Sequence, residues 1–350
     1  MKTKKWNELT ARILTSLIFA SFSGSTALAA LPDGYTIDKD GSYIYTNDVT
    51  SDISGKPGDK IVLRGGTTAM KAPKNVTGGY SETGDVTKSS VTVNQNVLLY
   101  RNNLYGGKAK GNGEVKASQN TITITSSNER ISTEEVFGGY AKLNKAADGK
   151  AAGEASNNTV TVRVNSASLM DNHTNLYGGR VDVDTDDSYT ASADSNVVNA
   201  EGVAIRASIV GGIIFPATLN STENRADLSA SNNTVIIKNS VFGDANGVYG
   251  GFLRGYKGGI QHGTVSGNTL TFDNSEFRVP DKRKSEHNLH GDMAAGVFFG
   301  TEGTVSDNTL TVNKLSATII DSYVTFAGAE AIVDGSKADA SLKITGNTAR

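Results

Sequence analysis

Hydrophobic and polar residues alternate in a short segment that recurs along most of this chain of 350 residues. In the clearest copy, Asn120-Thr121-Ile122-Thr123-Ile124, an Asn is followed by Thr residues that alternate with aliphatic residues. A period of two places the aliphatic side chains on one face of a β-strand and the hydroxyls on the other. Half-buried strands of this kind are predicted at 121–124, 159–162, 234–237, 269–272 and 309–312.

The Asn of this motif returns at a nearly constant interval. It stands at positions 120, 158, 196, 233, 268, 308 and 347, which are 38, 38, 37, 35, 40 and 39 residues apart. Such a period is the signature of a repeat architecture, because one strand cannot bury its apolar face alone and stacked repeats can. The stacked Asn side chains are expected to form a ladder at one corner, with amide hydrogen bonds between neighbouring coils.

A second marker, an apolar residue followed by two glycines, lies between successive Asn residues. It occurs as Tyr105-Gly106-Gly107, Phe137-Gly138-Gly139, Tyr177-Gly178-Gly179, Val210-Gly211-Gly212 and Tyr249-Gly250-Gly251. Glycine fits a position that needs positive φ or close backbone approach, so the pair is expected at another corner. Two markers in each repeat predict two coils, each of about half the repeat length.

Together these features predict an all-β fold, a right-handed parallel β-helix (β-solenoid) with repeats of roughly 38 residues over residues 76–350. A β-propeller is the rival architecture because its blades have a similar period, but its antiparallel blades need regular hairpin signals that the sequence lacks. Residues 30–75 lack the full motif and are the candidate N-terminal cap, which would protect the first open edge. The charged segment from Phe277 to His290 is predicted to protrude as a loop.

The first 29 residues have the parts of a secretory signal peptide. Basic residues at positions 2, 4, 5 and 12 precede an apolar run from Ile13 to Phe22, and Ala27-Leu28-Ala29 has the small-residue pattern of a cleavage site. The apolar run is too short for a transmembrane helix. Residues 1–29 are therefore predicted to be removed on export, which takes away four basic residues and Glu8 and changes the net charge from −2 to −5.

Composition narrows the classes of function. A mildly acidic exported chain does not suit nucleic acid or an anionic membrane as its partner. The chain has no cysteine, which excludes disulfides, thiol nucleophiles and cysteine zinc sites. Aromatic residues make up only 7% and glycines number 39, a balance that favours a thin repetitive β architecture over a compact globule.

An export signal followed by Asn-Thr-Val-Thr-Val (158–162) and Val-Tyr-Gly-Gly (248–251) repeats, in a cysteine-free chain, resembles the passenger regions of Gram-negative autotransporters, which use type V secretion. The resemblance covers nearly all of the mature chain and implies an adhesin-like passenger, since the family commonly serves adhesion. It implies export through the inner membrane, passage through an outer-membrane barrel, and a β-helix at the cell surface or outside the cell. The implied partners are host-surface glycans or proteins, or neighbouring bacterial cells.

The family also carries a C-terminal membrane barrel of amphipathic strands, and none is visible before Arg350. A truncated gene product is therefore expected. A secreted solenoid without a barrel of its own is the alternative.

The sequence contains four histidines, which are His173, His262, His287 and His290. The segment from His287 to Asp292 brings two imidazoles and a carboxylate together and suits a divalent metal, with a polar loop as the simpler interpretation. The acidic run from Asp182 to Asp187 would attract calcium, but it lacks the glycine and distal Glu of an EF-hand loop and reads as a solvated turn.

Two pairs of carboxylates would serve glycoside cleavage if the fold placed them face to face: Glu134 with Glu135, and Asp194 with Glu201. Neither G-x-S-x-G nor H-E-x-x-H occurs in the sequence. We therefore assign no residue a catalytic, cofactor-binding or metal-binding role, and no cofactor is expected.

The rows of Thr and Asn allow two interpretations. They supply solubility and β propensity in one, and a flat adhesive face for glycans or proteins in the other. The expected role is a non-enzymatic adhesin or structural surface protein. The alternatives are a β-helical polysaccharide lyase or hydrolase, which a cleft with convergent carboxylates or basic residues would favour, and a passive stalk for a missing domain.

Overall fold

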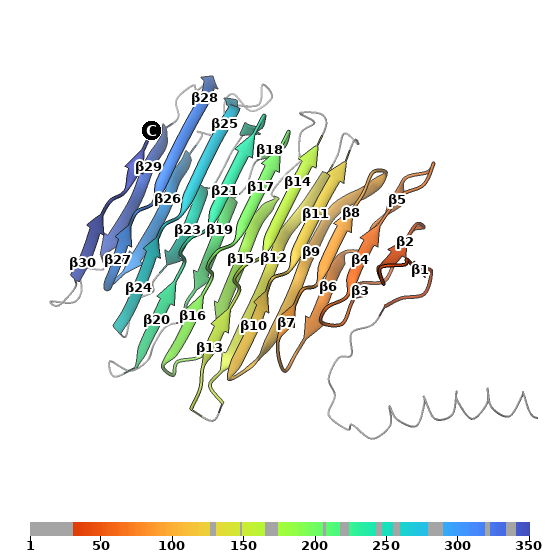
Figure 1. Ribbon diagram of the computed structural model, residues 1–350, viewed down its shortest axis with the longest axis horizontal. Coiled ribbons are helices and arrows are strands. Elements are labelled where there is room, and N and C mark those ends of the chain that lie inside the picture. The colour runs from red at the N-terminus through yellow and green to blue at the C-terminus, as the bar shows by residue number, and fades with distance from the viewer. Residues whose placement is uncertain are drawn as a thin grey trace, which may run out of the picture.

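The protein is built of β-strands that wind into three long sheets, as the computed structural model shows (Figure 1). The structure describes residues 31–126, 131–147, 149–164, 174–205, 208–217, 224–242, 247–254, 260–278, 290–318, 323–333 and 341–350. The predicted signal peptide, residues 1–29, and most of the predicted loop between Phe277 and His290 lie outside these residues.

Within the described residues, sheet 1 has 13 strands and contains the Asn-Thr motif. Its strands are β1 (Tyr35–Ile37), β2 (Tyr43–Tyr45), β4 (Lys60–Leu63), β8 (Ser90–Val93), β11 (Thr121–Ser126), β14 (Thr159–Val164), β17 (Val197–Glu201), β18 (Ala204–Ile205), β21 (Thr234–Lys238), β22 (Val241–Phe242), β25 (Thr269–Arg278), β28 (Thr309–Thr318) and β31 (Thr348–Ala349).

Sheet 2 has 10 strands and contains the paired glycines, and sheet 3 has eight shorter strands. The strands of sheet 2 are β3 (Ile53–Ser54), β5 (Met70–Lys71), β6 (Asn75–Ser81), β9 (Val97–Asn112), β12 (Ile131–Lys145), β15 (Asn175–Val183), β19 (Ser208–Phe215), β23 (Gly247–Arg254), β26 (His290–Gly300) and β29 (Tyr323–Val333). Those of sheet 3 are β7 (Val86–Thr87), β10 (Glu114–Ser118), β13 (Ala152–Glu154), β16 (Tyr189–Ser192), β20 (Arg225–Ser229), β24 (Ile260–Ser266), β27 (Glu302–Ser306) and β30 (Ser341–Thr345).

Neighbouring coils pair in parallel and in register, which confirms the predicted parallel β-helix. Thr121 lies opposite Thr159 in sheet 1, and Lys116 lies opposite Glu154 in sheet 3. The strand pair β1–β2 is antiparallel, with Tyr35 opposite Tyr45, and parallel pairing begins with β2 and β4. The strand β1 therefore turns back on the first parallel strand and ends the ladder of sheet 1 on that side.

Each repeat makes one coil of three strands, so the prediction of two shorter coils per repeat is wrong. The chain passes from β11 in sheet 1 to β12 in sheet 2 and β13 in sheet 3, and then returns to sheet 1 at β14. The second marker, the pair of glycines, lies inside the long strand of sheet 2, so it does not mark the end of a coil. A residue and its neighbour on the next coil are therefore a full repeat apart in sequence.

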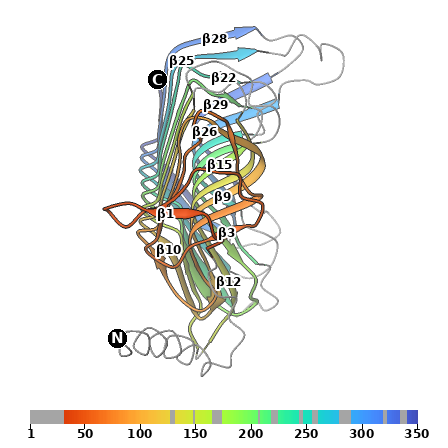
Figure 2. The same ribbon diagram turned by 90° about the vertical axis from the view of Figure 1, so that its right-hand side faces the viewer.

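The three sheets enclose a flat interior with two apolar compartments. Sheets 1 and 3 lie side by side on one face, and sheet 2 covers both from behind (Figures 1 and 2). Aliphatic residues of sheet 1 such as Ile122 pack against Leu104 and Val136 of sheet 2. Small residues of sheet 3 such as Ala191 form a cluster with Val181 from farther along the strands of sheet 2.

A ladder of Asn side chains, fully buried from Asn120 to Asn308 and partly buried at Asn347, separates the two compartments at the corner between sheets 3 and 1, which confirms the expected Asn ladder. The backbone N–H and the side-chain Nδ2 of Asn158 both donate to Oδ1 of Asn196 on the next coil, at 3.0 and 3.1 Å. The same two bonds connect each successive pair from Asn120 to Asn347. The buried amide of each ladder Asn from Asn120 to Asn308 is satisfied in this way.

Left-handed backbone, with positive φ, occurs at the residues that precede the ladder Asn and not at the paired glycines. The residue before each ladder Asn has positive φ, for example 60° at Gln119 and 58° at Asn157. The prediction that the glycine pair makes a corner is wrong, because the glycines lie within extended strands of sheet 2. Their predicted close approach is confirmed, since a β-carbon on Gly106 would lie 2.5 Å from the carbonyl oxygen of Gly138.

Candidate functional site

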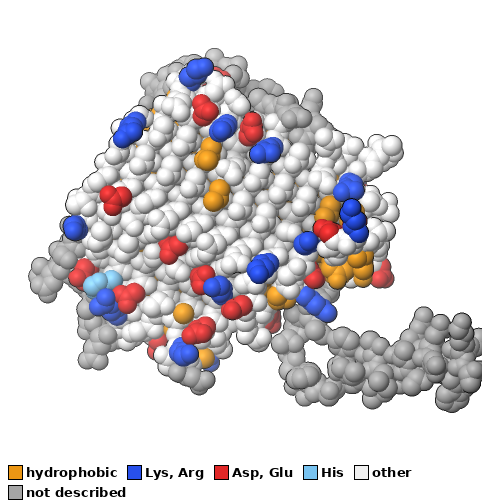
Figure 3. Space-filling view, viewed as in Figure 1, with side chains coloured by type: hydrophobic (Ala, Val, Ile, Leu, Met, Phe, Trp, Pro, Cys, Tyr) orange, Lys and Arg blue, Asp and Glu red, His pale blue; other side chains and the backbone are white. Residues whose placement is uncertain are grey.

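The outer face of sheet 1 is a flat array in which short Thr hydroxyls predominate, with Val197, Asn199 and Ile236 in the same rows on β17 and β21. Thr121 and Thr123 point outward from β11, and Thr159 and Thr161 continue their rows on β14. Because neighbouring parallel strands lie about 4.8 Å apart, the hydroxyls repeat at this interval along the axis. Figure 3 shows this upper part of the face as mostly uncharged, with scattered charged and apolar side chains.

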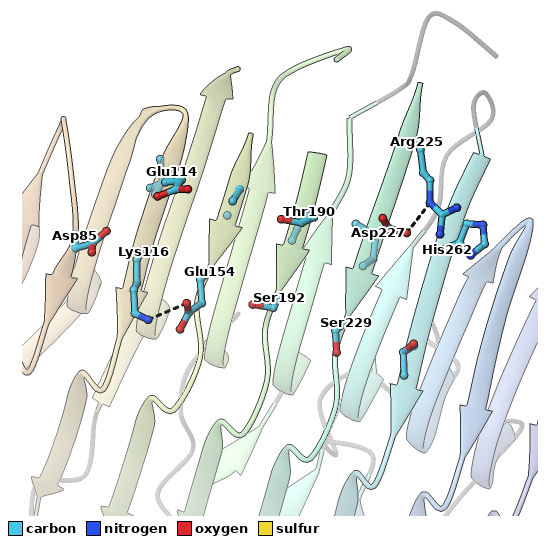
Figure 4. Close-up of a pocket in the computed structure, with 16 residues that line it drawn as sticks. Asp85, Glu114, Lys116, Glu154, Thr190, Ser192, Arg225, Asp227, Ser229 and His262 are labelled. Carbon is cyan, nitrogen blue, oxygen red and sulfur yellow. Dashed lines mark hydrogen bonds and ion pairs between the residues drawn. The ribbon is translucent and has the colours of Figure 1, made fainter. Parts of the chain in front are cut away.

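The outer face of sheet 3 is hollowed into a groove of about 730 Å³ that crosses several strands (Figure 4). Its floor is formed by small residues in the middle of the sheet, including Ala152, Thr190 and Ser192. Larger charged side chains stand toward its two ends. A second hollow of about 340 Å³ shares His262 and Thr264 with the first, so the groove continues to β30.

Ion pairs hold the charged side chains at one end of the groove. Lys116 Nζ lies 2.9 Å from Glu154 Oε2 on the next coil, and the hydroxyl of Ser118 donates to Glu154 Oε1 at 2.7 Å. Both charged side chains are about one-third exposed, at 39% and 31%. They therefore keep access to solvent while their positions are restrained.

At the other end, Arg225 Nε donates to Asp227 Oδ1 at 2.8 Å. Asp227, His262 and Glu302 lie in one row across three successive coils, and His262 Nε2 lies 2.7 Å from Glu302 Oε2. These groups provide both hydrogen-bond donors and acceptors on the groove wall, so the groove suits a polar ligand.

Asp194 lies beside the groove and is partly buried. Its Oδ1 accepts hydrogen bonds from the Ser229 hydroxyl at 2.8 Å and the Ser231 backbone N–H at 2.6 Å. Burial raises the pKa of Asp194 above its ordinary value, the two hydrogen bonds oppose that rise, and the charge of Glu154 adds to it. A carboxyl group with a raised pKa can hold a proton closer to neutral pH.

The outer face of sheet 2 has a different arrangement, a stack of aromatic rings around Arg180. Phe137 stacks between Tyr105 and Tyr177 with ring centroids 5.0 and 5.1 Å away. The guanidinium of Arg180 lies against these rings and donates to both oxygens of Asp182, at 2.8 and 3.1 Å. Because the rings, Arg180 and Asp182 already interact with one another, we interpret the cluster as packing and not as a ligand site.

The structure does not bring the predicted carboxylate pairs together as two facing groups. Glu135 lies 3.5 Å from Arg180 Nη1, and burial raises the pKa of Glu135 while Arg180 opposes the rise. Glu201 belongs to sheet 1, where it pairs with Arg163 at 3.6 Å, and Asp194 lies beside sheet 3. The carboxylate whose charge acts on Asp194 is Glu154, which the sequence did not single out.

The carboxylates of the acidic run at 182–187 interact with separate partners. Asp182 is held by Arg180, Asp184 lies 3.7 Å from Lys142 Nζ, and Asp187 accepts a hydrogen bond from the Thr185 hydroxyl. In the part of the chain that the structure describes, no group of three His, Asp or Glu side chains is placed to hold a metal ion. His173, His287 and the side chain of His290 lie outside what is described.

Alignment of the repeats on the Asn would have placed the residues that line the groove in common rows. The residue four positions before each ladder Asn forms one row of the groove, and the residue six positions before forms the next row. The first row is Lys116, Glu154, Ser192, Ser229, Thr264, Thr304 and Lys343. The chemistry changes from coil to coil within a row, so no local motif marks it.

Comparison with protein-family models, with curated proteins and with solved structures finds no match to this chain. Within the described residues, no helix has the length and the apolar character needed to cross a membrane.

Proposed function

We propose that this chain is an exported, cell-surface β-helical protein of the autotransporter-passenger type that acts as an adhesin or structural surface protein and not as an enzyme. The observation that carries the proposal is the flat outer face of sheet 1, where Thr rows stand in register on most coils and are interrupted at Val197, Asn199 and Ile236 (Figure 3). A long regular face of this kind offers many equivalent weak contacts, and their sum gives adhesion. The proposed partners are host-surface glycans or proteins, or neighbouring bacterial cells.

The export part of the proposal is tested on the full chain expressed in a Gram-negative cell. The expected product outside the inner membrane begins at Ala30, as read by N-terminal sequencing. A product that keeps residues 1–29 and stays in the cytoplasm contradicts it.

The adhesive part is tested with the mature chain coated on a surface to which host cells or bacterial cells are added. Lys substitution of Thr123, Thr161 and Thr271 interrupts the face, and cell attachment is expected to fall to the level of an uncoated surface. The matched control places Lys at Thr50, Thr68 and Thr83, which are exposed and lie outside the strands of sheet 1. Equal attachment to both variants would contradict a role of the hydroxyl face.

A second candidate function, cleavage of a polysaccharide, is favoured by the proximity of Glu154 and Asp194 at the groove. Asp194 lies two residues beyond Ser192, the neighbour of Glu154 on the next coil. The charge of Glu154 contributes to the raised pKa of Asp194, and inverting glycosidases use two carboxyl groups of which one has a raised pKa. Release of reducing ends from a polysaccharide panel, lost in both Glu154→Gln and Asp194→Asn, would favour the enzyme over the adhesin.

A further inference from the structure

We propose that the groove on sheet 3 binds a linear, uncharged polysaccharide chain that lies along the helix axis. This inference rests on the proposed adhesive function and names its partner. It is carried by the shape of the groove, the spacing of its polar groups and its charge.

The groove is long and open, and it crosses the strands. Its two hollows share His262 and Thr264, so it runs from Asp85 near β7 to Lys343 in β30. A ligand that fills it must be elongated and must cross successive coils. A small metabolite would occupy only a fraction of this length.

The floor of the groove repeats one polar position on each coil. Ser192, Ser229 and Thr264 are register partners on β16, β20 and β24, and each presents a hydroxyl. Their spacing is set by the strand separation of about 4.8 Å. A polymer with hydroxyl groups on every unit can form hydrogen bonds on several coils at once.

The sheet itself excludes an extended peptide as the occupant. Peptides join β-proteins mainly by adding a strand to an exposed edge. The strands beneath the groove, from β10 to β27, are each hydrogen-bonded to a neighbour on both sides. Their backbone N–H and C=O groups are therefore already paired and cannot bind an added strand.

Charge decides between the classes of polysaccharide. The two hollows are lined by five carboxylates, which are Asp85, Glu114, Glu154, Asp227 and Glu302, and by three cations, Lys116, Arg225 and Lys343. An acidic polymer would meet a surplus of negative charge, which opposes its binding. Carboxylates accept hydrogen bonds from sugar hydroxyls, and Lys and Arg donate to them, so a neutral chain is complementary.

The probe for the test is a length series of neutral oligosaccharides, cellobiose, cellotetraose and cellohexaose, titrated into the mature chain by calorimetry. Saturable binding that strengthens with length is expected, because longer chains reach more coils. An oligogalacturonate and a chitosan oligosaccharide of matched length are the acidic and cationic comparisons. Tighter binding of either charged oligosaccharide, or absence of saturable binding in the neutral series, would overturn the inference.

The location is tested by filling the groove. The double change Thr190→Gln and Ser192→Gln is expected to weaken binding of cellohexaose about tenfold, since hydrogen bonds on one coil are lost. Thr159→Gln with Thr161→Gln, on the outer face of sheet 1, is the matched control and should bind like the parent chain. Equal affinity of the groove variant and the parent chain overturns the site.

A variant that misfolds is recognised by a lowered melting temperature, and Lys116→Gln then takes its place. It removes a donor from an exposed ion pair and should weaken binding severalfold with the fold retained; unchanged affinity overturns the site.

Cell attachment separates the two proposals. If cells attach and neutral oligosaccharides do not bind, the groove inference fails and adhesion stands. If oligosaccharides bind and no cell attaches, the adhesive role fails and the groove stands.

Discussion

The side chain of Asn158 occupies the space that a β-carbon on Gly139 would need. Such a β-carbon would lie 2.6 Å from Asn158 Cγ, across the interior of the coil. The two sequence markers, which are far apart in the repeat, therefore face each other. Their contact divides the apolar interior into its two compartments.

This contact predicts that Gly139→Ala destabilises the β-helix. Overpacking of a filled interior costs about 1–3 kcal/mol, and here the added methyl meets both a buried amide and the backbone oxygen of Ala117. The urea midpoint followed by circular dichroism measures the effect. Gly84→Ala is the control, because its β-carbon would have Ser81 Oγ as nearest neighbour at 3.8 Å. Equal midpoints for the two variants would disprove the steric argument.

The Asn ladder predicts a second sensitive position. Asn196→Ala removes the acceptor for two donors of Asn158, the backbone N–H and Nδ2, and each buried group without a partner costs about 1–3 kcal/mol. We expect a clear fall in the urea midpoint. Asn199→Ala changes an outward-facing residue of the same strand and should leave the midpoint nearly unchanged. A small effect at Asn196 would mean that water replaces the lost acceptor.

Two Arg–Asp pairs with the same Nε–Oδ1 distance predict how burial changes the contribution of an ion pair to the free energy of unfolding. Arg180–Asp182 and Arg225–Asp227 both have an Nε–Oδ1 distance of 2.8 Å, but the Arg side chains are 20% and 50% exposed. Arg180→Ala is expected to cost about 1.5–3 kcal/mol, because it leaves carboxylates in an aromatic surrounding. Arg225→Ala should cost no more than about 1 kcal/mol. Denaturation midpoints that fall equally would contradict the argument from burial.

The raised pKa of Asp194 predicts a pH-dependent effect of Asp194→Asn. A carboxyl group whose folded-state pKa lies above its unfolded value favours the folded state when protonated, so its contribution to stability falls as pH rises through that interval. Asn can still accept both hydrogen bonds and does not ionise. The stability of the variant relative to the parent chain is therefore expected to improve between acidic and neutral pH, as measured by urea midpoints at each pH. Asp33→Asn, at an exposed position, is the control. A pH-independent difference would contradict a raised pKa.

The groove could have been predicted in part from the sequence. Its hydroxyls stand at a fixed distance from the ladder Asn, so aligned repeats would place Ser192, Ser229 and Thr264 in one row. That this row faces outward over a hollow depends on the small side chains beside it, and these follow no repeated pattern. The pairing of Arg180 with Asp182 needed the structure as well, because a spacing of two places both side chains on one face without showing which groups surround them.

By itself the sequence determined the β-strands, their period and the Asn ladder, because alternation and regular spacing are local properties that stacking in register preserves. The tertiary structure alone decided that one repeat makes one coil of three sheets, that Gly139 faces Asn158, and that Glu154 and not Glu201 accompanies Asp194. The physical reason is that these relationships depend on where the chain bends between strands. A bend is set by packing across the interior, where residues distant in the repeat compete for the same space.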